Sequence, residues 1–87
     1  MSEVEVTDSF PLMFAEKGEV VWLTEIRSGD KLRRRLNELG LYVGMEVRVV
    51  QGSNSGPMIL AVKNDTRLAV GRGMAQKIMV KRSKGAE

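Results

Sequence analysis

The stretch DKLRRRLNELGLYVGMEVRVV, residues 30–50, decides the fold of this chain. In its first half Leu32, Leu36 and Leu39 recur at i, i+4 and i+7, which places them on one face of an amphipathic helix. The charged and polar residues between them point elsewhere. A helix of about ten residues is marginal in water by itself. We therefore expect this leucine stripe to be held against a sheet.

A sharp turn and a strand follow the helix at once. Gly40 suits the left-handed position just beyond a helix, and Leu41 is expected to pack back on Leu36, the contact that accompanies a Schellman motif. Gly44 ends the turn that follows. Residues 45–51 then alternate in the period-two pattern of a strand. Helix, stop and exit are thus specified by neighbouring residues.

Period-two alternation on either side of this unit predicts a small β domain. The connections are short, and Asn64-Asp65 is typical of a hairpin turn. Five strands with one helix inserted after the first predict a mainly β fold, a small, partly open barrel of the SH3-like kind. In the oligonucleotide-binding barrel, the main alternative, the helix usually falls between the third and fourth strands. The expected strands are residues 19–26, 45–51, 58–63, 66–70 and 77–81.

Length and composition allow one small domain. The chain has 87 residues, 43% of them hydrophobic, which is enough for a single core. We assign the domain to residues 10–81, with an N-terminal tail at 1–9 and a C-terminal tail at 82–87. No apolar run approaches the roughly 20 residues that cross a bilayer, and the acidic start is unlike a signal peptide. A soluble cytoplasmic protein is expected.

The residue inventory argues against an enzyme. The chain has no cysteine and no histidine, which removes the thiolate and imidazole ligands of zinc sites and the commonest nucleophiles and general bases. The carboxylates are scattered. The glycine-rich segments at 52–56 and 71–73 lack the Gly-Lys-Ser/Thr ending of a phosphate-binding loop. We expect no catalytic residue, no cofactor and no metal site.

Positive charge is concentrated in the later part of the chain. The formal net charge is +3, but 13 basic and four acidic residues lie between Arg27 and Lys84. This excess allows an anionic partner. Residues 44–56 look like the KOW element of ribosomal barrels, so nucleic-acid binding is the alternative function. Aromatic stacking residues are few, with Trp22 and Tyr42 the main candidates, and Trp22 is expected at the core or its edge. Nucleic acid is therefore not the expected partner.

Short motifs spread over some 70 residues follow the order of a known family pattern. They are Leu12, Gly18, Arg35-Leu36, Leu39-Gly40-Leu41, Gly44, Val47, Val49, Gly56-Pro57, Ala75, Ile78 and Val80. This pattern resembles the FeoA family, small cytoplasmic proteins of ferrous iron transport. Val43 stands where the family usually has proline, which is expected to loosen the turn. Gly71-Arg72-Gly73 replaces the family's usual apolar-arginine run.

The resemblance implies an SH3-like barrel and a non-enzymatic partner of FeoB, the membrane permease with a cytoplasmic GTP-binding domain. The chain would meet the membrane only through the permease, and need not itself bind iron. Self-association into a homo-oligomer is left open. An arginine supplied in trans to the permease's GTPase is a further hypothesis. The expected contact residues near the helix exit are Arg33, Arg34, Leu41, Tyr42 and Met45.

Overall fold

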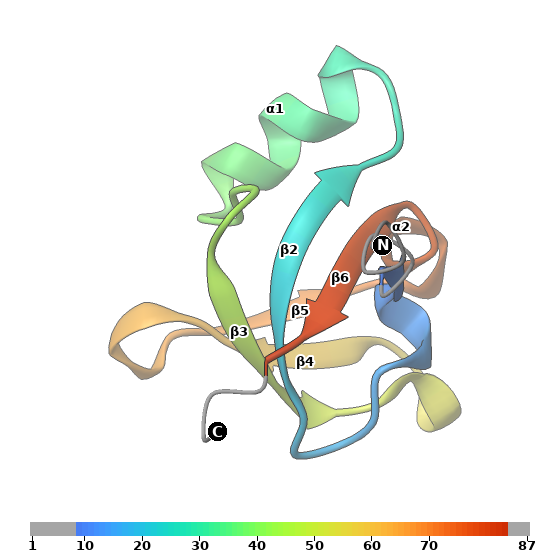
Figure 1. The fold of residues 1–87 in the computed structure, drawn as a ribbon, viewed down its shortest axis with the longest axis vertical. Coiled ribbons are helices and arrows are strands. Elements are labelled where there is room, and N and C mark those ends of the chain that lie inside the picture. Colours follow the sequence, from blue (N-terminus) through green and yellow to red (C-terminus); the bar gives the residue numbers. More distant parts are fainter. Residues whose placement is uncertain (1–8, 84–87) are drawn as a thin grey trace, which may run out of the picture.

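Six antiparallel strands form one sheet in the order β1-β6-β2-β3-β4-β5. The computed structural model describes residues 9–83. The sheet curls into a partly open barrel in which β4 and β5 cross behind β2 and β6 (Figure 1). The strands are β1 (Phe10–Pro11), β2 (Val20–Ile26), β3 (Glu46–Gln51), β4 (Met58–Ala61), β5 (Arg67–Val70) and β6 (Ile78–Arg82). The helices are α1 (Asp30–Glu38) and α2 (Arg72–Ala75), with 3-10 turns η2 (Leu12–Phe14), η3 (Ser53–Ser55) and η4 (Lys63–Asp65).

The expected fold class, a mainly β barrel with a short helix, is confirmed. The structure adds a strand, β1, that the sequence did not reveal. This strand has only two residues, and its partner β6 lies at the opposite end of the domain's sequence. The helix α1 consequently follows the second strand and not the first. At the other end, β6 continues to Arg82, one residue beyond the expected domain boundary. The two expected tails otherwise fall almost wholly outside the described residues.

The core is built from aliphatic side chains that both layers of the barrel supply. The helix α1 contributes Leu36 and α2 contributes Ala75, each fully buried. Leu12, in η2, is also fully buried. The remaining core residues are Ala15, Val21, Leu23, Ile26, Leu41, Val47, Val49, Met58, Leu60, Val70, Ile78 and Val80.

A β-bulge in β2 corrects the expectation for Trp22. Leu23 pairs with Val80 while Glu25 pairs with Met79, so Thr24 is an extra residue without a partner in the ladder. The bulge reverses the alternation, and β2 therefore buries Leu23 before it and Ile26 after it. Trp22, which the sequence placed at the core or its edge, is 42% exposed.

The leucine stripe of α1 is only partly buried. Leu36 is fully buried and Leu32 is partly buried, but Leu39 is 44% exposed. The helix stands beyond the end of β2, over one end of the barrel, and does not lie flat on the sheet (Figure 1). Leu36 therefore reaches the core and Leu32 packs against it, whereas Leu39 does neither. The expectation that Leu39 packs in the core is wrong.

The end of α1 forms the expected Schellman motif. Gly40 has φ +98°, the left-handed conformation that glycine adopts without steric cost. The N–H of Leu41 donates to the carbonyl of Leu36 over 2.9 Å, and the N–H of Gly40 donates to that of Asn37 over 3.0 Å. Leu41 and Leu36 both enter the core cluster.

Other turn residues also have the conformations that the sequence indicated. Asn64 and Asp65 have φ of 60° and 62°, as the two central residues of a type I′ hairpin turn require. Gly56 has φ +120°, and Pro57 follows it as the chain enters β4. These turns set the register between β3, β4 and β5.

Candidate protein-interaction site

A groove lies between α1 and the end of β2, and we call it the helix groove. Its volume is about 450 Å³. The helix supplies a cation and an amide, β2 supplies one wall, and the turn after the helix supplies exposed apolar side chains. The lining residues are Thr24, Glu25, Ile26, Arg33, Asn37, Tyr42 and Val43.

A tight turn positions the apolar side of the helix groove. The N–H of Met45 donates to the carbonyl of Tyr42 over 3.2 Å, and Gly44 has φ +97°. These features define a type II turn with Val43 and Gly44 at its centre. Two hydrogen bonds to Leu23 of β2 hold this turn in place. The Gly44 N–H donates to the Leu23 carbonyl over 2.7 Å, and the Leu23 N–H donates to the Met45 carbonyl over 2.9 Å. Tyr42 and Val43 are each 53% exposed.

The three consecutive arginines of α1 point in different directions because successive helical residues are about 100° apart. Arg33 shares the groove side with Asn37, four residues later. Arg34 is exposed but does not line the groove. Arg35 lies about 200° from Arg33 around the helix axis. Only Arg33 of the three is therefore placed beside Tyr42.

The structure divides the expected contact residues into three groups. Arg33 and Tyr42 line the helix groove, and Arg34 lies outside it. Met45 is partly buried, with its sulfur 3.1 Å from the backbone nitrogen of Tyr42. Leu41 is fully buried, which excludes it from any contact surface of the folded domain. Leu41 directly follows Gly40 in the Schellman motif, and this burial is expected because the residue at that position packs back on the helix.

Sequence reasoning missed two exposed apolar residues near the helix exit. Leu39 is 44% exposed and Val43 is 53% exposed. Val43 could have been identified, because it occupies a position in a tight turn. Leu39 could not, because its spacing from Leu32 and Leu36 is that of a core residue.

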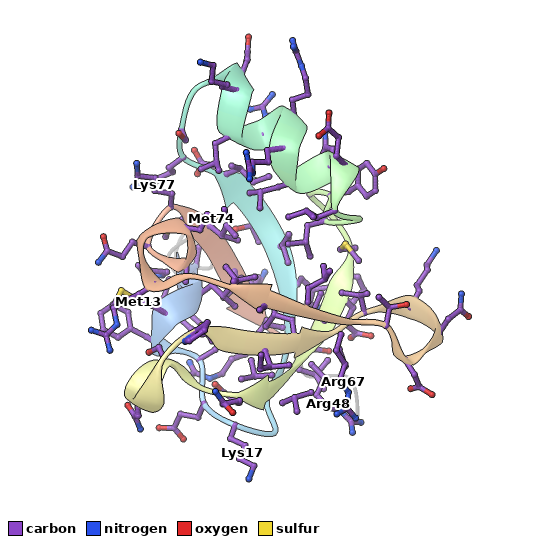
Figure 2. The ribbon with its side chains drawn as sticks, turned by 180° about the vertical axis from the view of Figure 1, so that it is seen from behind. Met13, Lys17, Arg48, Arg67, Met74 and Lys77 are labelled. Carbon is purple, nitrogen blue, oxygen red and sulfur yellow. The ribbon has the colours of Figure 1, made fainter. Side chains whose placement is uncertain are left out.

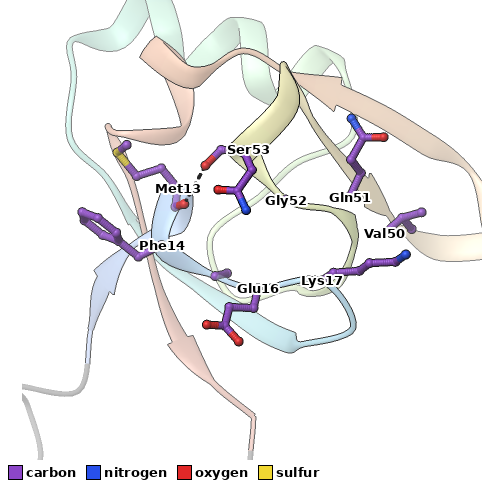
Figure 3. Close-up of a pocket in the computed structure, with 10 residues that line it drawn as sticks. Met13, Phe14, Glu16, Lys17, Val50, Gln51, Gly52 and Ser53 are labelled. Atoms are coloured by element: carbon purple, nitrogen blue, oxygen red, sulfur yellow. Dashed lines mark hydrogen bonds between the residues drawn. The ribbon is translucent and has the colours of Figure 1, made fainter.

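Two further grooves occur on the described surface. The loop groove, about 750 Å³, lies between η2 and the loop after β3, where the hydroxyl of Ser53 donates to the Met13 carbonyl over 3.1 Å (Figure 3). Phe14, at its rim, is 62% exposed. The sheet groove, about 610 Å³, crosses the outer side of β3, β4 and β5, and both Arg48 and Arg67 line it (Figure 2).

One carboxyl group has a shifted pKa. The pKa of Glu19 is held below its ordinary value mainly by the backbone N–H of Glu16, which donates to Glu19 Oε1 over 2.7 Å. Partial burial acts in the opposite direction and raises this pKa, whereas the Arg82 guanidinium lowers it further. Arg82 also lies over the Phe10 ring, 4.5 Å from its centroid. These contacts join β1, β6 and the segment just before β2, and none of the residues involved lines the helix groove.

Residues 9–83 contain no group of three or more acidic side chains that could hold a metal ion. In the same part of the chain, no helix is both long and apolar enough to span a membrane.

Comparisons with known proteins give a consistent result. The FeoA domain family model matches residues 10–82. The "Putative Fe(2+) transport protein A" of Methanocaldococcus jannaschii is 39% identical over 71 residues, covering 82% of this chain and 84% of that protein.

Solved structures agree with the sequence comparisons. The crystal structure of an iron uptake regulatory protein (FeoA) superposes with a TM-score of 0.78 and 29% identity, covering 86% of this chain and 99% of that one. The solution structure of the FeoA protein from Chlorobium tepidum gives 0.75 and 28%, covering 90% and 74%. A manganese-dependent transcriptional repressor, at 0.77 and 19%, shares the fold over 86% of this chain and 37% of its own. With the family model matching nearly the whole described domain, this chain belongs to the FeoA family.

Proposed function

We propose that this protein is an accessory protein of ferrous iron transport that binds the cytoplasmic, GTP-binding part of a FeoB-type permease. Membership of the FeoA family and similarity to a relative named for Fe(2+) transport support the transport role. The permease is proposed as the partner because the resemblance to this family implies it. Such a partner places the protein in the cytoplasm, with the membrane met only through the permease.

The helix groove is the observation on which the proposed contact rests. Arg33, Tyr42 and Val43 bring a cation, an aromatic ring and an aliphatic side chain to one concave site. Arginine and tyrosine are enriched among the residues that dominate binding energy at protein interfaces. Leu39, just beyond the end of the same helix, is also exposed but does not line the groove. This composition suits a protein partner better than it suits a small polar substrate.

A binding role without catalysis is part of the proposal. The chain has neither cysteine nor histidine, the commonest sources of nucleophiles and general bases, and residues 9–83 contain no group of three or more acidic side chains that could hold a metal ion. The contribution of the protein to transport would then be to bind and orient the permease. Iron need not contact this chain at all.

The test is a fluorescence titration of labelled FeoB cytoplasmic domain with the full chain, with and without guanine nucleotide. Saturable binding is expected, weakened about tenfold or more by Tyr42→Ala and by Arg33→Glu, since truncating such anchors typically costs 1–2 kcal/mol or more. Arg35→Glu is the matched control, because it makes the same charge change on the other side of the helix. GTP turnover measured in the same samples tests the arginine-in-trans hypothesis.

Absence of saturable binding in both nucleotide states would reject the permease as partner. Equal weakening by Arg33→Glu and Arg35→Glu would reject the helix groove while keeping the partner. Both variants change exposed residues, so circular dichroism is expected to show an unchanged fold.

A further inference from the structure

The sheet groove has a regular arrangement of two arginines across three strands. Arg48 of β3 pairs with Ala61 of β4, and Ala61 pairs with Arg67 of β5. Residues that are directly opposite in antiparallel strands project to the same face. With neighbouring strands about 4.8 Å apart, the two arginine backbones are roughly 10 Å apart. Figure 2 shows the Arg48 and Arg67 side chains beside one another on this side of the barrel.

Between the two arginines the residue is small. Ala61 presents a single methyl group, so two long guanidinium side chains stand on either side of a short one. Lys17 and Lys63 add two further cations to the lining of the groove. Val20, Val50 and Val62 add partly exposed apolar side chains to the lining, whereas the lining residues Val47 and Val49 have their side chains in the core. This geometry leaves room for an anion above Ala61.

The cations of the sheet groove are not neutralised within the described chain. The ion pairs found in residues 9–83 join Arg27 to Glu25 and Arg82 to Glu19, and neither involves a groove cation. Of the two acids in the lining, Glu46 accepts a hydrogen bond from the Ser83 hydroxyl over 2.9 Å. Like charges facing one another on a sheet repel. An anion between Arg48 and Arg67 would relieve that repulsion.

Phosphate is the anion that suits this arrangement. A guanidinium is planar and donates two parallel hydrogen bonds, which match the spacing of phosphate oxygens. A groove of about 610 Å³ has the size of a small-ligand site, and the partly exposed Val20, Val50 and Val62 offer apolar contact to the remainder of such a ligand. Glu46 and Asp65 in the lining would repel a flat anionic bilayer or a continuous nucleic-acid backbone. Their carboxylates can instead accept hydrogen bonds from ligand hydroxyl groups.

We propose that the sheet groove binds the phosphate group of a small phosphorylated compound, held between Arg48 and Arg67. This site is separate from the helix groove, with which it shares no lining residue. It adds a ligand to the protein and does not depend on the permease being the partner.

The test uses inorganic pyrophosphate as the probe and the full 87-residue chain. Isothermal titration calorimetry at low ionic strength is expected to show saturable binding, and amide NMR shifts are expected to concentrate at Arg48, Ala61 and Arg67. Arg48→Gln and Arg67→Gln should each lower the affinity about tenfold or more, because each removes hydrogen bonds to a charged group. Arg48→Lys should also lose affinity, since lysine keeps the charge but not the fork.

Two further variants separate a built site from diffuse positive charge. Ala61→Leu keeps every cation but fills the space between the arginines, so it is expected to abolish pyrophosphate binding. Arg35→Gln removes one positive charge from α1 and is expected to leave binding unchanged. Tyr42→Ala, which weakens the proposed permease contact, should also leave pyrophosphate binding unchanged.

Several outcomes would overturn the proposal. Equal losses in Arg35→Gln and Arg48→Gln, or wild-type affinity in Ala61→Leu, would show that only overall charge is being measured. Binding of phosphatidylglycerol vesicles or of single-stranded RNA, without binding of pyrophosphate, would assign the groove to a large polyanion instead. If the protein binds no pyrophosphate and no amide resonance of the sheet groove shifts, the proposed site does not exist.

Discussion

The N–H of Leu41 donates to the carbonyl oxygen of Leu36 over 2.9 Å, and both leucine side chains are fully buried. Residues 36–41 thus both end α1 and fix Leu41, the residue after the turn, in the core. The bend between the two leucines depends on Gly40, at φ +98°.

Gly40→Ala is expected to destabilise the domain by about 1–2 kcal/mol, the cost of forcing a side chain into the left-handed conformation. No steric clash contributes, since a methyl group at this position would meet nothing within 4 Å. Urea unfolding measures the change. Gly73→Ala is the control of opposite sign. Gly73 lies inside α2 with open space around it, and alanine there should stabilise by about 0.4–1 kcal/mol. Losses of equal size in both variants would contradict the argument.

Leu36→Ala and Leu39→Ala test how α1 rests on the barrel. Leu36 is fully buried, so its truncation should cost about 2–5 kcal/mol. Leu39 is 44% exposed and should cost well under half as much. Thermal unfolding distinguishes the two, at roughly 4–8 °C per kcal/mol for a domain of this size. If both variants lost the same stability, α1 would pack along its whole leucine stripe.

Val43→Pro should stabilise the domain. Val43 is the first central residue of a type II turn, where proline presets the backbone angle. The expected gain is about 0.4–1 kcal/mol, mainly from a less flexible unfolded chain. Gly44→Ala, at the next residue, should destabilise because Gly44 has φ +97°. Denaturant midpoints check both signs, and a loss in Val43→Pro would show that the turn is of another type.

Glu19 predicts a pH dependence of stability. Its pKa is lowered in the folded state, first by the Glu16 N–H and then by Arg82, against the effect of partial burial. A lowered folded pKa means that the charged form stabilises the fold above the ordinary pKa of about 4.5, and that this contribution is lost as the pH falls through the folded pKa.

Glu19→Gln should therefore be less stable than the parent protein at pH 7, and the difference should shrink as the pH falls below about 4.5. Unfolding curves measured at several pH values give this difference. Glu16→Gln is the control, because it removes a neighbouring carboxylate but keeps the backbone N–H that donates a hydrogen bond to Glu19. A difference that stays constant between pH 7 and pH 3 would show that Glu19 acts through packing alone.

The parts of the fold that follow from near neighbours were predictable. Leu36, Gly40 and Leu41 lie close together in the sequence, and the hairpin at Asn64-Asp65 is equally local. The bulge at Thr24 depends on distant partners. Its hydroxyl lies 3.2 Å from that of Ser9, and it interrupts pairing with β6, more than 50 residues away. Because that bulge was not foreseen, Trp22 was expected at the core or its edge, whereas it is 42% exposed.

The candidate sites were predictable only in part, for a related reason. Arg33 and Tyr42 lie near each other in the chain, so a common surface at the helix exit could be inferred. Arg48 and Arg67 meet only through the register of three strands, and no local pattern reveals that they flank Ala61. The same lack of a local signal hid β1, whose two residues pair with β6.

The position of β6 governs when the domain can be completed during synthesis. This strand, the latest of the described chain to be translated, lies between β1 and β2. Until residues 78–82 have left the ribosome, β1 has no neighbour and one side of β2 is an open edge. Hairpins formed by β3, β4 and β5 can form earlier because their contacts are local. The growing chain therefore exposes an unpaired, aggregation-prone edge of β2 until β6 has been synthesised. A chaperone that shields nascent chains would be most needed in that interval.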